Sequence, residues 1–245
     1  MIGLATLTSR ATAGPAYPPT PEDLRDVRVA GLDFPLRATV ALFVATLVVL
    51  LDYTGVLQLQ QPLYFLDREP DPNLLRALER AVLFGLVPLA VVVLGFRDRP
   101  SRYGLKLGDW RWGLGLLLVG LAIMTPIILG LAQVPAFRDY YGAGSHPGLL
   151  STALTNALEL FPAEFLLRGF LLFALYRRIG PLALIVVQVP FIFAHIGKPE
   201  LELYSTFIGG TIFAWLDWRT GSIVWSALGH LYVLTLMLVA VSAVR

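Results

Sequence analysis

The chain has 245 residues, of which 56% are hydrophobic and only 15% are charged, and its mean hydropathy is +0.70. These values exclude an ordinary soluble domain and predict a polytopic membrane protein. Its net charge of +2 comes from basic residues dispersed between apolar runs, so we expect no nucleic-acid partner. The absence of cysteine excludes disulfides, thiolate nucleophiles and cysteine-ligated zinc.

The first 35 residues are polar and contain several prolines. This composition predicts an N-terminal arm, residues 1–35, that is loosely ordered or lies on the surface. The arm lacks the apolar core of a secretory signal peptide, so we expect the later spans to target the chain to the membrane. The remaining residues, 36–245, are expected to form one transmembrane helical domain.

Apolar stretches follow the arm at 36–59, 73–96, 112–134, 148–178, 180–196, 203–216 and 221–244. As a helix, the fourth stretch would be roughly 45 Å long, which exceeds the hydrocarbon core of about 30 Å and predicts a tilt, a kink at Pro162 or an interfacial start. The fifth and sixth stretches are short, which predicts a thinned membrane or a water-filled recess where they meet. We therefore predict an all-α polytopic membrane protein with about seven to eight transmembrane helices in one bundle.

The loops predict how the chain is oriented. If the N-terminus is inside, the segments on that side carry more Lys and Arg than the segments on the other side. Because positively charged loops stay in the cytoplasm, we expect a multi-pass protein with a cytoplasmic N-terminus.

The fourth apolar stretch contains charged residues, Glu164 and Arg168 among them. A charge at that depth costs about 2.5 to 3.5 kcal/mol on insertion scales, so intramembrane ionisable residues indicate function by default. Their spacing of four places both side chains on one helical face, where they can form an ion pair. A pair that only neutralises charge and fixes helix packing would have the same spacing.

Two histidines favour the functional interpretation. His195 ends the fifth apolar stretch, and His230 lies inside the last one. Counted from the inner ends of their stretches, Glu164, His195 and His230 lie at depths of roughly 20, 21 and 14 Å. We therefore expect the three side chains to meet at a comparable level in the membrane.

A glutamate and two histidines suit two chemistries. In the first, Glu164 activates a water as general base beside Arg168, and a histidine stabilises the oxyanion. In the second, Glu164, His195 and His230 bind a metal such as zinc, which activates the water. We favour the first chemistry, without a cofactor, because the sequence lacks a helical two-histidine zinc motif.

These residues also form a series of short motifs. The series runs Glu164-Phe-Leu-Leu-Arg168-Gly169-Phe170, then Phe191-xxx-His195, then Trp215-xxx-Arg219-Thr220-Gly221-Ser222, and reaches His230. It resembles the CPBP (Abi) family of glutamic-type intramembrane proteases, which includes the CAAX prenyl endopeptidases. The resemblance covers residues 161–234, within a protease-like core that we place at 148–244.

The resemblance implies an intramembrane peptidase that cleaves a membrane-anchored protein or peptide in the lipid bilayer. It implies catalysis by a glutamate-activated water, with histidines stabilising the intermediate. The substrates of relatives include prenylated C-termini, bacteriocin-like leaders and C-terminal sorting tails. A bacterial inner membrane fits the resemblance.

The sequence departs from the family pattern at two positions. Family members usually have a second glutamate where this chain has Ala163, and an asparagine where it has Leu234. Either Glu164 must therefore supply the base, or Glu159 must reach in from across Pro162. In the loop after His195, Glu200 could support a histidine or a substrate terminus.

The alternative to an enzyme is a catalytically inactive family member that acts as a membrane peptide-binding or scaffold protein. A small-solute transporter is less consistent with the sequence, because the chain is short and shows no internal repeat.

Overall fold

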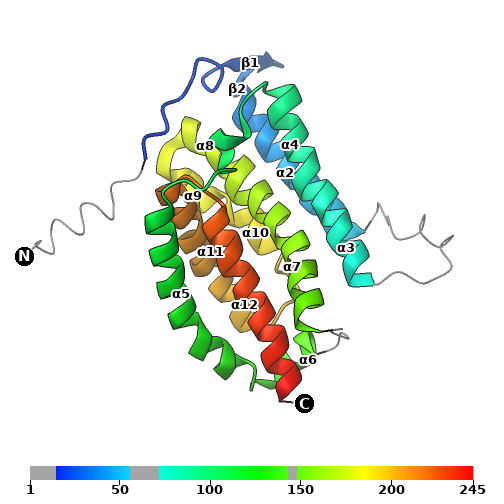
Figure 1. Cartoon of the computed structure of the whole chain (residues 1–245). Coiled ribbons are helices and arrows are strands. Elements are labelled where there is room, and N and C mark those ends of the chain that lie inside the picture. The colour runs from blue at the N-terminus through cyan, green and yellow to red at the C-terminus, as the bar shows by residue number, and fades with distance from the viewer. Residues whose placement is uncertain (1–14, 56–71, 143–147, 245) are drawn as a thin grey trace, which may run out of the picture.

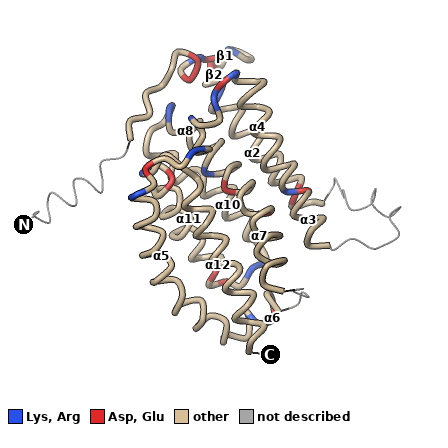
Figure 2. Tube along the Cα trace, in the orientation of Figure 1, with Lys and Arg blue, Asp and Glu red and all other residues tan. Residues whose placement is uncertain are grey.

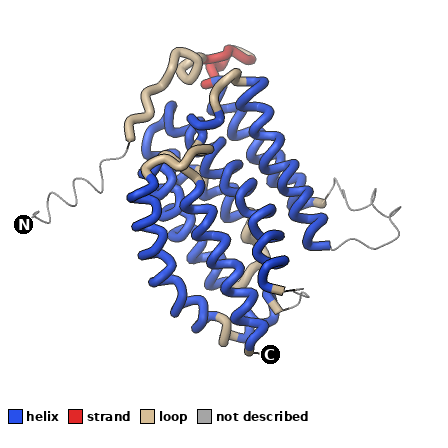
Figure 3. The backbone as a smooth tube through the Cα atoms, viewed as in Figure 1, coloured by secondary structure: helices blue, strands red, loops and turns tan. Residues whose placement is uncertain are grey.

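The structure, a computed structural model, describes residues 15–55, 72–142 and 148–244. It is a bundle of helices with one small β-hairpin at one end (Figures 1 and 3). The predicted fold class, an all-α polytopic membrane protein, is confirmed. Parts of two predicted segments, 1–14 of the arm and 56–59 of the first span, lie outside the described residues.

The N-terminal arm contains an ordered hairpin that its composition did not predict. Strand β1 (Asp26–Val29) pairs antiparallel with β2 (Leu32–Pro35). The two turn residues, Ala30 and Gly31, both have positive φ, as a tight two-residue hairpin requires. The hairpin leads directly into the first helix, so the arm is attached to the bundle on this side.

The described helical segments follow in chain order. Their bounds are α2 (Leu36–Thr54), α3 (Pro72–Arg80), η2 (Ala81–Leu86), α4 (Val87–Ala90), η3 (Val91–Gly95), η4 (Pro100–Tyr103), α5 (Trp110–Leu131), α6 (Pro135–Tyr141), α7 (Leu149–Glu164), η5 (Phe165–Leu171), α8 (Leu172–Ile179), η6 (Gly180–Leu182), α9 (Ala183–Val186), α10 (Gln188–Phe193), α11 (Glu200–Thr220) and α12 (Val224–Ala243). Segments η2, η3 and η5 are π-helical, whereas η4 and η6 are 3₁₀ turns.

Among the described residues, 5 helical stretches are long and apolar enough to cross a membrane: Leu36–Thr54, Pro72–Gly95, Trp110–Leu131, Leu149–Phe193 and Val224–Ala243. The fourth of these joins two of the predicted spans into one stretch of 45 residues. The sixth predicted span corresponds to α11, which carries ionisable residues at both ends. The predicted number of seven to eight spans therefore stays a prediction.

The centre of the bundle is the passage from α7 through η5 into α8. Every residue from 164 to 175 is buried. Helix α7 continues through Pro162, and the wider π-helical winding starts three residues later, at Phe165. Proline removes one backbone hydrogen bond, and π-helical turns are frequent at functional sites. The irregular winding thus lies in the segment that carries Glu164 and Arg168.

Helices α5 and α7 both pack against α12, and α10 packs against α11. The contact between α10 and α11 depends on Gly210, because a Cβ atom there would lie 2.2 Å from Oε1 of Gln188 and 2.8 Å from the ring of Phe191. A larger residue at this position would push α10 away from the bundle. This close approach holds the segment that ends at His195.

Charged residues gather mainly at the end of the bundle that carries β1 and β2, and long apolar stretches separate them from the other end (Figure 2). A smaller number of charged residues lie within the bundle, around α7, α10 and α12.

Candidate active site

Glu164 is the last residue of α7, and only 1% of its side chain is exposed. Arg168, in η5, is equally buried and forms an ion pair with Oε2 of Glu164. The predicted pairing across one helical turn is therefore present. A paired carboxylate and guanidinium can remain charged in a bundle core, because each offsets the cost of removing the other from water.

His230, on α12, joins this pair. Its Nδ1 lies 2.7 Å from Oε1 of Glu164. A carboxylate oxygen accepts, so Nδ1 carries the hydrogen and Nε2 is left for another partner. The side chain of His230 is 16% exposed, whereas that of Glu164 is 1% exposed. Helices α7 and α12, far apart in the sequence, thus bring a carboxylate and an imidazole together.

His195 lies in the turn after α10 and is 7% exposed. Its Nδ1 lies 2.8 Å from the backbone oxygen of Phe191, so Nδ1 donates and Nε2 is again the free nitrogen. The ring also packs edge to face on the ring of Phe191, with 4.5 Å between the ring centroids. The hydrogen bond and the ring contact fix the orientation of the imidazole.

One cavity of about 380 Å³ brings the three predicted residues together. Glu164, His195 and His230 all line it, although they come from α7, the turn after α10, and α12. The two positions that depart from the family pattern, Ala163 and Leu234, line the same cavity. The departures therefore change the wall of this cavity directly.

The predicted supporting residues differ in their placement. Glu159 lines the cavity, but its carboxylate forms an ion pair with Arg80, which also pairs with Asp52 at 2.7 Å. Glu200 is exposed at the start of α11 and is not among the residues that line the cavity. The structure thus brings Glu159 to the site, one helical turn before Ala163, and leaves Glu200 outside it.

A further group lines the cavity beside His195. Lys198 forms an ion pair with Glu202 at 2.8 Å, and the hydroxyl of Tyr141 donates to Glu202. Burial and the nearby carboxylate of Glu202 raise the pKa of Tyr141 far above its ordinary value, so its hydroxyl stays protonated. This side of the cavity therefore offers hydrogen-bond donors.

Sequence reasoning missed two residues behind Glu164. The hydroxyl of Ser226 lies 3.3 Å from Oε2 of Glu164 and 2.8 Å from Oδ2 of Asp217. Both Ser226 and Asp217 are 0% exposed. Asp217 lies within α11, directly after the sixth predicted stretch, which ends at 216. An acidic residue at the end of an apolar stretch was the signal that could have found it.

The polar groups around Glu164 are only partly satisfied. Nε and Nη2 of Arg168 and Oδ1 of Asp217 are buried without a hydrogen-bond partner within the described part of the chain. The guanidinium of Arg168 instead lies over the rings of Phe191, at 4.1 Å, and Phe213, at 5.4 Å. Such cation–π contacts partly compensate for missing hydrogen bonds.

The metal alternative would need Glu164, His195 and His230 as ligands. Among the described residues, no group of three or more His, Asp or Glu side chains is close enough to hold a metal ion in this geometry. Nδ1 of His230 is engaged with Glu164, and Nδ1 of His195 with a backbone carbonyl. Zinc binding by these residues therefore stays a hypothesis for experiment.

A comparison with protein families matches residues 145–236 to the model described as type II CAAX prenyl endopeptidase Rce1-like. No curated protein and no solved structure matches the chain. The matched range contains Glu164, Arg168, His195 and His230, and it includes the whole range, 161–234, that the motifs covered. The chain therefore carries an Rce1-like segment, similar to type II CAAX prenyl endopeptidases, and the predicted resemblance is confirmed.

Proposed function

We propose that this chain is a membrane-embedded endopeptidase that hydrolyses a peptide bond of a membrane-associated protein. The observation that carries the proposal is the cavity of about 380 Å³ that Glu164, His195 and His230 line together inside the Rce1-like segment. Convergence of a carboxylate and two imidazoles in one concave site is a pattern suited to general acid–base hydrolysis.

Glu164 has room to activate a water. An ionised carboxylate offers about four lone-pair sites. In the structure Oε1 accepts from His230, and Oε2 accepts from Arg168 and Ser226, which leaves one site on Oε1. A water accepted there would lose its proton to Glu164 as its oxygen attacks the substrate carbonyl.

The two histidines that line the cavity with Glu164 would complete the site. Neutral His195 has a lone pair on Nε2, which accepts from the same water and orients it. His230, when protonated beside Glu164, donates from Nε2 to the carbonyl oxygen as that oxygen becomes negative. Arg168 keeps the glutamate in its ionised form before the reaction.

The proposed reaction balances without a cofactor. The water oxygen forms a bond to the carbonyl carbon, and the water proton moves to Glu164. When the carbon–nitrogen bond breaks, Glu164 returns that proton to the leaving amine, and the products are a carboxylic acid and a free amine. Glu164 thereby regains its ionised form for the next cycle.

The departures at Ala163 and Leu234 favour a second candidate, a catalytically inactive protein that binds a membrane-anchored peptide. Both residues line the cavity, so the site lacks one carboxylate and one amide that family members usually have. Glu159, one turn before Ala163, is the other carboxylate of α7 besides Glu164, and it is held by Arg80. The inactive candidate predicts that peptides bind but are not cleaved.

Cleavage of membrane-anchored peptides by the purified protein in vesicles tests both candidates. We expect cleavage by the unaltered chain and loss of cleavage in Glu164→Gln, His195→Ala and His230→Ala. Asp33→Asn, an exposed carboxylate on β2, is the control for loss of a charge. Cleavage that persists in both Glu164→Gln and His230→Ala would overturn the assignment, and binding without cleavage would support the inactive candidate.

Metal analysis of the same preparations tests the mechanism. We propose that no metal takes part, so the purified protein should hold less than one equivalent of zinc and keep its activity in chelator. Stoichiometric zinc that is lost in His195→Ala would overturn the proposal and favour metal-assisted hydrolysis.

We further propose a setting in the inner membrane of a bacterium, with the N-terminus in the cytoplasm and no nucleic-acid partner. The excess of basic residues on the N-terminal side supports this orientation. The substrate would be one of the classes suggested by the resemblance: prenylated C-termini, bacteriocin-like leaders or sorting tails. Protease access to tags at each terminus, in sealed vesicles, measures the orientation directly.

A further inference from the structure

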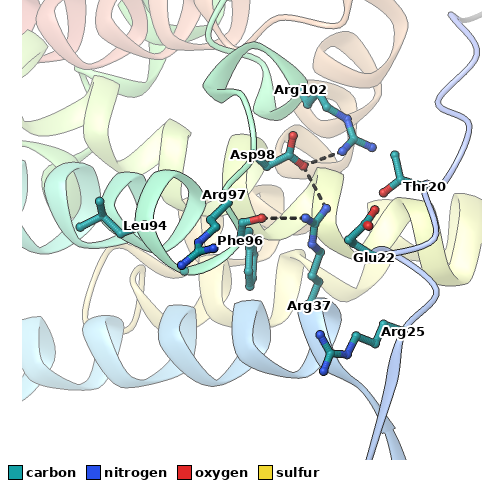
Figure 4. A pocket seen from close by; sticks show the side chains of 10 residues that line it. Thr20, Glu22, Arg25, Arg37, Leu94, Phe96, Arg97, Asp98 and Arg102 are labelled. Atoms are coloured by element: carbon teal, nitrogen blue, oxygen red, sulfur yellow. Dashed lines mark hydrogen bonds and ion pairs between the residues drawn. The ribbon is translucent and has the colours of Figure 1, made fainter.

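A second cavity, of about 650 Å³, lies at the end of the bundle that carries the N-terminal arm. Its wall combines the arm, the start of α2, the end of η3 and the loop that leads into η4 (Figure 4). Four arginines line it, namely Arg25, Arg37, Arg97 and Arg102, against two acidic residues, Glu22 and Asp98. The cavity wall therefore has an excess of positive charge, and nothing in the proposed peptidase reaction uses it.

Two of these arginines are fixed by carboxylates. Arg37 pairs with Asp23 at 2.7 Å and with Asp98 at 3.0 Å, and it also donates to the backbone oxygen of Phe96. Arg102 pairs with the same two aspartates. Asp23, Arg37, Asp98 and Arg102 thus form one network of ion pairs, which we call the arm network. Three of its members, Arg37, Asp98 and Arg102, line the cavity.

The other two arginines are available. Arg25 and Arg97 are exposed, and neither has an ion-pair partner among the residues that the structure describes. Arg97 has a φ of 52°, a left-handed conformation that non-glycine residues rarely adopt. The backbone is held in this turn because the amide of Asp98 donates to the carbonyl of Val92. An unusual backbone conformation thus places an unpaired guanidinium at the edge of the cavity.

The cavity lies where the apolar part of the bundle ends. Leu94 lines it, is 74% exposed and is the next-to-last residue of the apolar stretch Pro72–Gly95. Arg37 is the second residue of the stretch Leu36–Thr54. The arginines therefore lie at the level of the lipid headgroups, and Leu94 begins the surface that faces the acyl chains.

We propose that this cavity binds the phosphate group of an anionic phospholipid. The guanidinium forks of Arg25 and Arg97 match the geometry of phosphate oxygens, and an acyl chain would lie along Leu94. Basic pockets between helices at the membrane boundary recognise anionic headgroups in this way. The lipid would join Arg25 of the arm to Arg97 of the bundle and so hold the arm against the bundle.

Native mass spectrometry of the full chain in detergent tests the proposal with phosphatidylglycerol as the probe. Phosphatidylcholine is the neutral comparison, and inorganic phosphate separates a lipid site from a site for the free anion. The test variant is Arg25→Gln/Arg97→Gln. The matched control is Arg28→Gln/Arg99→Gln. Its two arginines are exposed and lie close in sequence to Arg25 and Arg97, but they are not among the residues that line the cavity.

We expect tighter binding of phosphatidylglycerol than of phosphatidylcholine. The test variant should bind phosphatidylglycerol roughly 25-fold more weakly, and the control variant should match the unaltered chain. Equal losses in both variants would overturn the proposal, because they would indicate non-specific attraction. Unchanged binding in the test variant would also overturn it, as would full occupancy by inorganic phosphate that blocks the lipid. Peptidase activity does not enter the measurement, so its outcome is independent of the proposed function.

Discussion

Two of the clusters of charged residues in this bundle, the arm network and the residues around Glu164, are built differently. In the arm network, Asp23 and Asp98 each pair with both Arg37 and Arg102. Around Glu164, by contrast, Arg168 and Asp217 have buried polar atoms without partners in the described structure, although neither residue lines the cavity. In the arm network each acid pairs with two arginines, whereas Glu164 pairs with one arginine and one histidine.

The difference indicates what each cluster does. A network in which every acid has several cationic partners stabilises the attachment of the arm, and it has no free site left for chemistry. A cluster that leaves donors and acceptors unpaired in a buried place loses stability, which is expected of a site that binds or transforms a ligand. The comparison predicts that changes in the cavity affect activity and that changes in the arm network affect stability alone.

The largest expected effect is on catalysis. Glu164→Gln keeps the size of the side chain and removes the proton acceptor, so cleavage should fall by about 10² to 10⁴-fold. Asp23→Asn, the same change in the arm network, should leave the rate of cleavage per folded molecule unaltered. Rates are measured with one membrane-anchored peptide at equal concentrations of folded protein. A similar fall in both variants would remove the distinction between the clusters.

The second effect is on stability. Arg168→Leu leaves Glu164 buried without its guanidinium partner, which should cost about 3 to 5 kcal/mol in the free energy of unfolding. Arg37→Leu should cost less, about 1 to 3 kcal/mol, because Asp23 and Asp98 keep Arg102 as a partner.

Unfolding in mixed detergent micelles measures both costs. The double variant Glu164→Leu/Arg168→Leu is the control, because it removes both charges and should regain most of the lost stability. If the double variant were as unstable as Arg168→Leu, the loss would come from packing rather than from the unpaired carboxylate.

A smaller effect is expected at Ser226, whose hydroxyl lies 3.3 Å from Oε2 of Glu164 and would position that carboxylate. Ser226→Ala removes a donor to Oε2 and should lower kcat by roughly 10-fold with little change in KM. Ser226→Thr keeps the hydroxyl and should restore most of the rate. If Ser226 served packing alone, the added methyl group would not restore the rate. Steady-state kinetics of the two variants checks this.

The smallest effect concerns pH. Burial opposes ionisation of Asp23, but hydrogen bonds from Thr20, Arg102 and Arg37 outweigh it and hold the pKa of this carboxyl far below the ordinary value of 3.8. A lowered pKa contributes stability that is fully present above 3.8 and is lost as the pH falls further. Attachment of the arm should therefore not change from about pH 8 to about pH 5. Limited proteolysis of the residues just before β1 measures this attachment.

Much of the site could be predicted from sequence. Glu164 and Arg168 are four residues apart on a helix, so their pairing follows from local geometry, and the structure has it. The depths of His195 and His230 in the membrane could be estimated from helical rise alone. In the structure both residues line the cavity together with Glu164. Both estimates count positions along one apolar stretch at a time, whereas the meeting of the three stretches comes from helix packing.

Other features needed contacts between distant segments. The Ser226 hydroxyl reaches Asp217 and Glu164 only because α11, α12 and α7 converge, and no spacing in the sequence encodes that contact. Glu159, the alternative to Glu164 as the base, lines the cavity, but Arg80, 79 residues away, holds its carboxylate. The hairpin of the arm was also missed, because its strands are only 4 residues long.

The sequence by itself determined the membrane class, the helical bundle and the residue types available for chemistry, because composition and apolar length depend on no long-range contact. Only the tertiary structure decided which buried charged residues form ion pairs with one another. The same residue types, Arg with Asp or Glu, form a network of four ion pairs beside the arm, but only a single ion pair, Glu164 with Arg168, beside the cavity. Partner geometry, which is set by helix packing, is the physical reason for that difference.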